Sequence, residues 1–168
     1  EMLDATGHRV ATLLDRADKV LRPAILWNDA RSFAECKEIE AREPKARQIA
    51  GNIALAGFTA PKLVWVRKHE PDIFAKVAKV LLPEDYVRLR MTGDHASDMS
   101  DSAGTFWLDV EKRQWSDALL AASGMRREDS EALIETYELA SGTVTARPRL
   151  ICSRPFAMKA RRILFYLG

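Results

Sequence analysis

Four neighbouring residues carry side chains suited to holding a polyhydroxylated ligand. They are Trp27, Asn28 and Asp29, with Arg31 two positions further on. An aromatic face packs against the C–H side of a sugar, while amide and carboxylate groups pair with its hydroxyls. This group follows a predicted strand and precedes a predicted helix, which is where α/β proteins place their ligands. The alternative is structural: Trp27 belongs to the core, and Asn28 and Asp29 merely turn the chain before the helix.

A second polar segment, residues 97–102, contains Asp98 and Asp101 and raises the question of a metal site. A calcium loop needs oxygen ligands at alternate positions, a central glycine and a final glutamate, and this spacing lacks them. We therefore predict no metal site. Residues 95–105 are expected to form neither helix nor strand, but a loop whose Ser and Asp side chains satisfy its own backbone.

Two apolar runs, residues 10–15 and 20–27, precede the first group and predict a hairpin or two adjacent strands. The spacing of Ser32 and Glu35 is that of a capping box, which predicts a helix that ends near Pro44. The apolar stripe of this helix is expected to comprise Phe33, Cys36 and Ile39.

Residues 57–69 predict a second helix with bulky side chains on both sides, and therefore mostly buried. Thr59 can cap it, and Pro61 stands in its first turn, where the missing N–H costs nothing. The helix is expected to run to about Glu70. Lys62 is expected to lay its stem on the surface and to keep its ammonium in water.

Proline and glycine mark several of the remaining elements. Pro83 opens a helix that Gly93 closes in a left-handed cap. Mixed strands and helices in this order indicate an α/β fold without an internal repeat. The other expected elements are helices at 45–52, 71–77, 115–123 and 129–136, and strands at 80–82 and 106–110.

The composition is that of a soluble globular protein, with 168 residues of which 47% are hydrophobic and 30% charged. This length fits one ordinary domain, and no apolar run approaches the roughly 18 residues of a membrane span. Cys36 and Cys152 are far apart and form no CxxC motif, so neither a disulfide framework nor a zinc site is indicated. We expect a protein of the reducing cytoplasm.

The positive charge is concentrated at one end, because no Asp or Glu follows Glu138. Residues 143–168 are therefore predicted to be a basic, divergent tail and not a domain. A nucleic-acid-binding tail would combine basic residues with interleaved aromatic ones, and that pattern is missing, so we do not expect a nucleic-acid partner. The basic residues beyond Glu138 are Arg147, Arg149, Arg154, Lys159, Arg161 and Arg162.

Residues 57–69 resemble the N-terminal signature of the FGGY carbohydrate kinases. That signature begins with a small or aromatic residue, one position of any type, a small residue and two positions of any type. It continues with a lysine, an apolar residue, one position of any type, a tryptophan and an apolar residue. This chain has a matching residue at every fixed position. Leu-Pro-Glu-Asp-Tyr at 82–86 and Ser-Asp-Met-Ser-Asp-Ser-Ala-Gly-Thr at 97–105 resemble the xylulokinase branch in order and spacing. The resemblance covers residues 11–124.

The resemblance implies a ribonuclease-H-like, or actin-like ATPase, α/β fold, of which residues 1–142 would be a partial N-terminal domain. It also implies that Trp27 lines a sugar pocket. Xylulokinases place a Gly-Gln-Met-His-Gly turn before the first of the two strands, where this chain has Thr-Gly-His-Arg-Val. His8 falls one position early in that alignment. It is therefore either a further sugar-binding residue or a surface histidine without a role.

Two family motifs have no counterpart in the sequence: the Asp-x-Gly-Thr phosphate hairpin and the Gly-Gly-Asp-Asn turn with the catalytic Asp. We therefore assign no catalytic residue, and we expect neither ATP nor Mg²⁺ to bind this chain alone, although the parent enzyme uses both. The candidate sugar-binding residues are Trp27, Asn28, Asp29, Arg31 and His8.

The reaction implied for the parent enzyme converts ATP and D-xylulose to ADP and D-xylulose 5-phosphate. One alternative is another FGGY kinase, for ribulose, gluconate or glycerol. The other is a non-catalytic fragment or binding protein. The expected partners are the sugar and the nucleotide-binding C-terminal kinase domain, and a homodimer is left open.

Overall fold

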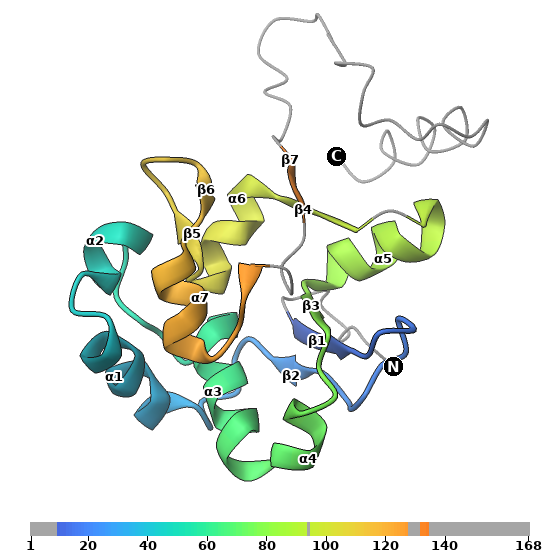
Figure 1. Cartoon of the computed structure of the whole chain (residues 1–168), viewed down its shortest axis with the longest axis horizontal. Coiled ribbons are helices and arrows are strands. Elements are labelled where there is room, and N and C mark those ends of the chain that lie inside the picture. The colour runs from blue at the N-terminus through green and yellow to red at the C-terminus, as the bar shows by residue number, and fades with distance from the viewer. Residues whose placement is uncertain (1–9, 94, 128–131, 135–168) are drawn as a thin grey trace, which may run out of the picture.

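The computed structural model describes residues 10–93, 95–127 and 132–134, in which helices and strands are mixed along the chain (Figure 1). The predicted α/β class is confirmed. The strands are β1 (Val10–Leu14), β2 (Ile25–Leu26), β3 (Lys79–Leu81), β4 (Ala96–Asp98), β5 (Leu108–Asp109), β6 (Gln114–Trp115) and β7 (Ala132–Ile134). The helices are α1 (Phe33–Arg42), α2 (Ala46–Ala50), α3 (Thr59–His69), α4 (Pro71–Phe74), α5 (Pro83–Thr92), α6 (Met99–Ser102), the 3₁₀ turn η1 (Ala103–Thr105) and α7 (Asp117–Ser123).

A three-stranded antiparallel sheet in the order β2-β1-β3 supports the turn that follows β2. The predicted run 20–27 forms a strand only at its end, while Val20 makes an isolated bridge with Leu14. Leu13 lies opposite Val80 in the register, and both side chains face the main core. Because side chains alternate across a strand, Leu14 points to the other face.

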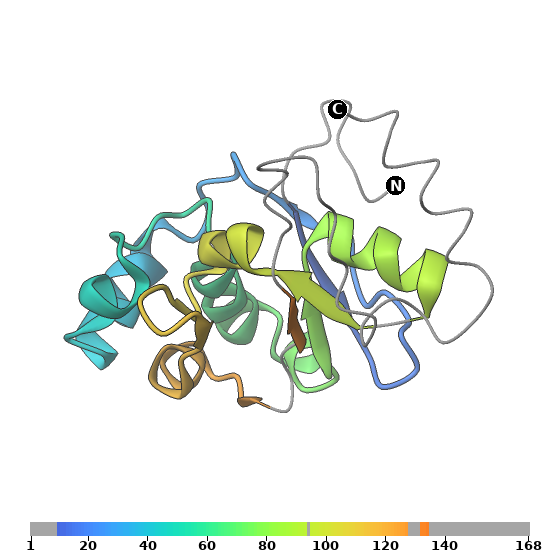
Figure 2. The ribbon, with the colours of Figure 1, turned by 90° about the horizontal axis from the view of Figure 1, so that it is seen from above.

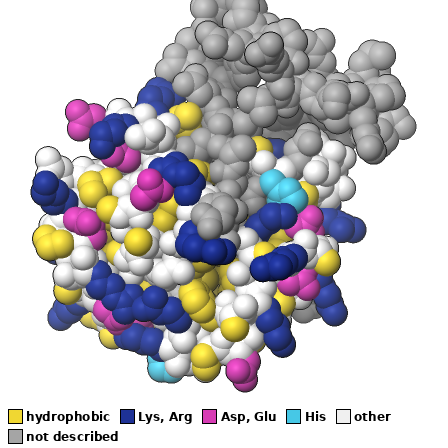
Figure 3. All heavy atoms as spheres, in the orientation of Figure 1, with side chains coloured by type: hydrophobic (Ala, Val, Ile, Leu, Met, Phe, Trp, Pro, Cys, Tyr) yellow, Lys and Arg dark blue, Asp and Glu magenta, His cyan; other side chains and the backbone are white. Residues whose placement is uncertain are grey.

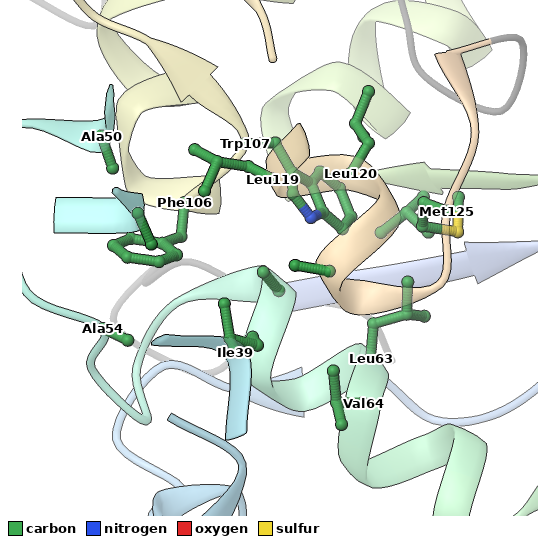
Figure 4. Packing of buried hydrophobic residues seen from close by; sticks show 14 of the residues in the cluster. Ile39, Ala50, Ala54, Leu63, Val64, Phe106, Trp107, Leu119, Leu120 and Met125 are labelled. Carbon is green, nitrogen blue, oxygen red and sulfur yellow. The ribbon is translucent and has the colours of Figure 1, made fainter. Parts of the chain in front are cut away.

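The main core gathers around α3, which α1 and α7 cover (Figures 1 and 4). Leu63 and Val64 of α3 are buried together with Phe106, Trp107 and Leu119. Full burial of one such aliphatic side chain contributes about 1.5–3 kcal/mol, which explains why α3 is the centre of the fold. The prediction of a mostly buried helix at this position is confirmed.

α5 covers the opposite face of the sheet (Figure 2). Leu89 packs there on Leu14 and Leu81, and Tyr86 borders them. Pro83 stands at the start of α5, and Gly93 ends it with φ 80°, as predicted. The sheet is therefore buried on both faces by helices that are distant in the sequence.

The prediction that residues 95–105 form an irregular loop is wrong. β4, α6 and η1 follow one another there, and β4 pairs in parallel with β7. Asp98 does satisfy the local backbone, since its Oδ1 accepts from the amides of Ser100 at 2.8 Å and Asp101 at 3.2 Å. It does so as the cap of a helix. β7 also replaces part of the helix predicted at 129–136, because parallel pairing depends on a distant strand and not on local propensity.

Both predicted side-chain caps are wrong as well. Ser32 makes no capping bond to α1, and its hydroxyl instead donates to the carbonyl oxygen of Ala56 at 3.2 Å. Thr59 is the first residue of α3 and Phe58 occupies the cap position. Phe33 is 68% exposed and does not belong to the apolar stripe, which Cys36 and Ile39 provide. α1 is therefore held by its packing and not by a capping box.

Acidic and basic side chains are interspersed over the face seen in Figure 3. Among the described residues, no helix is both long and apolar enough to cross a membrane. His8, Cys152 and the basic tail at 143–168 lie outside the described residues.

Candidate functional site

The chain makes a tight turn as it leaves β2. The amide of Asp29 donates to the carbonyl oxygen of Leu26 at 3.2 Å, and the amide of Arg31 donates to Oδ1 of Asp29 at 3.0 Å. Asn28 and Asp29 thus turn the chain before α1, as the structural alternative states. Trp27 is 44% exposed, however, so the assignment of Trp27 to the core is wrong.

Asp29 and Arg31 form a bidentate ion pair at this turn. Nε of Arg31 lies 3.0 Å from Oδ1 of Asp29, and Nη2 lies 2.7 Å from Oδ2. Hydrogen bonding from Arg31 is the largest influence on the Asp29 carboxyl, and it lowers the pKa of that group below 3.8. The carboxylate is therefore charged at neutral pH, and its orientation is fixed by a planar donor.

Trp65 of α3 packs against the Arg31 side of this pair. The guanidinium carbon of Arg31 lies 4.8 Å from the centre of the Trp65 ring, a cation–π arrangement. His69 stacks on the same ring at 4.7 Å, one helical turn further along. The aromatic residues of α3 thus limit the positions that Arg31 can adopt.

Lys62 is buried next to the site, so the expectation of a surface lysine is wrong. Its side chain is among the largest that are fully buried, at 1% exposure, and its Nζ donates to the carbonyl oxygen of Ala56. Burial lowers the pKa of Lys62 from 10.5 to about 8, while the charges of Asp29 and Cys36 oppose the shift. The sequence held one signal for this burial, because Lys62 precedes Leu63 and Val64 in a helix expected to be buried on both sides.

The loop before α3 lies against the turn. A Cβ on Gly57 would lie 2.9 Å from the carbonyl oxygen of Trp27, which is closer than real Cβ contacts. Glycine therefore permits the two backbones to approach. Together with the Ser32 and Lys62 bonds to Ala56, this contact joins the Trp27–Arg31 turn to the start of α3.

The four predicted residues that the structure describes thus belong to one turn. Asn28 is exposed, and no hydrogen bond ties its side chain to the rest of the described chain. An exposed indole, an amide and an oriented carboxylate can bind a polyol through its C–H face and its hydroxyls. His8 lies outside the described residues, and no group of three or more His, Cys, Asp or Glu among the described residues could hold a metal.

A second polar cluster lies between α5 and β4, where Asp85 and Ser97 line a pocket together with Thr59 of α3. Asp85 is buried and accepts from Oγ of Ser97 at 2.7 Å and from Nη1 of Arg88 at 3.0 Å. Beside it, burial and a hydrogen bond with Asp101 raise the pKa of Glu84 to about 7. This cluster joins β4 to α5.

The chain thus combines an α/β fold with a polar turn that leaves a strand and rests on a buried helix. The chain belongs to the FGGY family of carbohydrate kinases: the model of the N-terminal domain of that family matches residues 5–147. Xylulose kinase of Escherichia coli (strain K12) is 60% identical to it over 129 residues, which is 77% of this chain.

Solved structures agree with the family. A xyloylose kinase from Brucella ovis shares 58% of residues with a TM-score of 0.72 over 74% of this chain. A glycerol kinase from Plasmodium falciparum, solved with ADP, is 18% identical with a TM-score of 0.67 over 75% of this chain and 27% of its own length, and shows the shared fold. The chain spans 27% of the E. coli enzyme and 26% of the B. ovis structure.

Proposed function

We propose that this chain contributes the sugar-binding turn of a xylulose kinase, a cytoplasmic enzyme of pentose metabolism. The parent reaction transfers the γ-phosphoryl group of ATP to a hydroxyl of D-xylulose and forms D-xylulose 5-phosphate. In this proposal the chain holds the ketose, and a nucleotide-binding C-terminal domain supplies the Mg²⁺–ATP site and the catalytic base. The kinship with xylulose kinases at about 60% identity supports the choice of sugar.

One observation carries the proposal: exposed Trp27 stands two positions before Asp29 in the same turn, and Arg31 orients the carboxylate of Asp29. Trp27 would cover the C–H face of the ketose, while Asn28 and Asp29 would bond neighbouring hydroxyls. Holding a sugar in a fixed pose is a substantial part of phosphoryl transfer, because positioning removes much of the entropic barrier. No catalytic residue is assigned to these 168 residues.

The proposal is tested by calorimetric titration of the intact chain with D-xylulose, D-ribulose, D-gluconate and glycerol. D-Xylulose should bind most tightly, and Trp27→Ala should weaken it at least about tenfold, which corresponds to roughly 1.4 kcal/mol. Phe33→Ala is the matched control, since Phe33 is an exposed aromatic residue outside the proposed contacts. A preference for another sugar, or equal binding by Trp27→Ala, would contradict the proposal.

A further inference from the structure

The start of α3 places a buried cation beside the turn after β2. Lys62 is 1% exposed, although lysine is almost never fully buried unless it is paired. Among the described residues, its hydrogen-bond partner is not a carboxylate but the neutral carbonyl oxygen of Ala56. Packing alone does not explain why an ammonium group is buried at this position.

Lys62 donates its hydrogen bond to the loop that precedes α3, against which the turn rests. Ala56 accepts from Lys62 and also from the hydroxyl of Ser32, the residue that follows Arg31. The next residue, Gly57, lies against the carbonyl oxygen of Trp27. The bond from Lys62 therefore fixes the short loop on which both ends of the turn rest.

Lys62 also acts on the turn through its charge. Its ammonium lowers the pKa of Asp29, in addition to the larger influence of Arg31. The charged and titratable groups that influence Lys62 are Asp29 and Arg31 of the turn and Cys36 of α1. Asp29 and Arg31 are the two residues whose orientation the proposed sugar contact requires.

We propose that Lys62 is a positioning residue of the sugar site, which holds the 27–32 turn in its binding geometry through Ala56 and through its attraction to Asp29. This inference rests on the proposed function, because that proposal names the sugar. The ordering of the 27–32 turn by Lys62 can, however, be measured without a sugar. Lys62 itself does not touch the ligand. A residue that served stability alone would not need its charge, because a buried ammonium disfavours the folded state.

The test compares the intact chain with Lys62→Met, which removes the charge at similar length. Hydrogen exchange of the backbone amides at 27–32 should become at least about tenfold faster, and D-xylulose should bind at least about tenfold more weakly. Lys68→Met is the matched control on the same helix, because Lys68 is 40% exposed and pairs with Glu35 and Glu38. It should change neither quantity.

The pH dependence of sugar affinity and of amide protection tests the charge of Lys62 without removing its side chain. Between pH 7 and 9.5 the wild-type Lys62 loses its charge, so the affinity for D-xylulose should fall several-fold, and the protection of residues 27–32, corrected for intrinsic exchange, should fall with it. Lys62→Arg stays charged in this range, and its profile should be flat. If Lys62→Met does not fold, these pH profiles still show whether the charge of Lys62 orders the turn.

The outcomes separate this inference from the proposed function. If the wild-type chain binds no sugar, the proposed function fails, and the exchange of residues 27–32 alone decides whether Lys62 orders the turn. If Lys62→Met binds D-xylulose as the wild type does and its turn exchanges at the wild-type rate, Lys62 is not a positioning residue. A wild-type profile that is flat from pH 7 to 9.5 overturns the role of its charge.

Discussion

Arg31 holds both carboxylate oxygens of Asp29, with Nε 3.0 Å from Oδ1 and Nη2 2.7 Å from Oδ2. The two residues are separated by one position, so the pair also closes the turn after β2. This geometry makes Asp29 an oriented acceptor at the surface of the domain.

Replacing Arg31 with Ala should raise the pKa of Asp29 towards its ordinary value of 3.8, because hydrogen bonding from Arg31 is the main cause of the lowering. A carboxyl with a lowered pKa stabilises the folded state above its unfolded pKa, and that stability is lost as the pH falls through the folded value. The side chains of Arg31 and Asp29 are 38% and 27% exposed, so the ion pair contributes no more than about 1 kcal/mol to the free energy of unfolding. Carboxyl NMR titration measures the shift, and an unchanged Asp29 titration would contradict the prediction.

The free energy of unfolding should increase as the pH rises from 8 to 10.5. Lys62 has a pKa of about 8 when folded and 10.5 as its ordinary value, so the unfolded chain binds more protons in this range. One pKa unit corresponds to about 1.4 kcal/mol, which gives a gain of roughly 3 kcal/mol. Urea unfolding at pH 7 and pH 10 measures it. Lys62→Met should remove most of this gain. If the free energy of unfolding rises equally in the wild type and in Lys62→Met, other groups cause the rise.

Replacing Glu84 with Gln should stabilise the protein at pH 8 and not at pH 5. Burial and Asp101 raise the pKa of Glu84 from 4.5 to about 7, so its favourable contribution is complete below pH 4.5 and is lost as the pH rises through 7. The side chain is partly exposed, and solvent screening reduces the expected gain to about 1 kcal/mol. Urea midpoints at both pH values test this. Glu111→Gln, an exposed control, should show no such dependence on pH.

Replacing Gly57 with Ala should destabilise the fold by about 1–2 kcal/mol, because the new Cβ would lie 2.9 Å from a backbone oxygen of Trp27. It should also weaken the binding of D-xylulose, since the displaced backbone carries the indole. Gly93→Ala serves as the control: its φ of 80° makes the change costly, but the new Cβ meets no atom within 4 Å. Thermal unfolding and calorimetry measure the two effects. Equal binding by the two variants would contradict the proposed link between Gly57 and the site.

Local signals account for the elements that the sequence predicted well. Pro83 and Gly93 bound α5 because one lacks a donor that a first turn does not need and the other tolerates a positive φ. The grouping of Trp27, Asn28 and Asp29 after a strand is also local, since the three side chains are adjacent in the chain. Their placement in one turn therefore followed from the sequence, whereas their role in binding stays a prediction.

Other features depend on partners that are far away in the chain. The hydroxyl of Ser32 bonds Ala56 and not the end of its own helix, and β4 becomes a strand because β7 lies beside it. Residue type and spacing alone predicted the opposite in both cases. A hydroxyl or a short polar segment has several ways to satisfy its hydrogen bonds, and tertiary packing selects among them.

By itself the sequence determined the α/β class, the positions of most helices and the turn that carries Trp27 and Asp29. Only the tertiary structure decided that Lys62 is buried beneath that turn and that Phe33 faces the solvent. The reason is physical: the period of a helix tells which residues share a face, but burial of a face depends on which distant segment covers it.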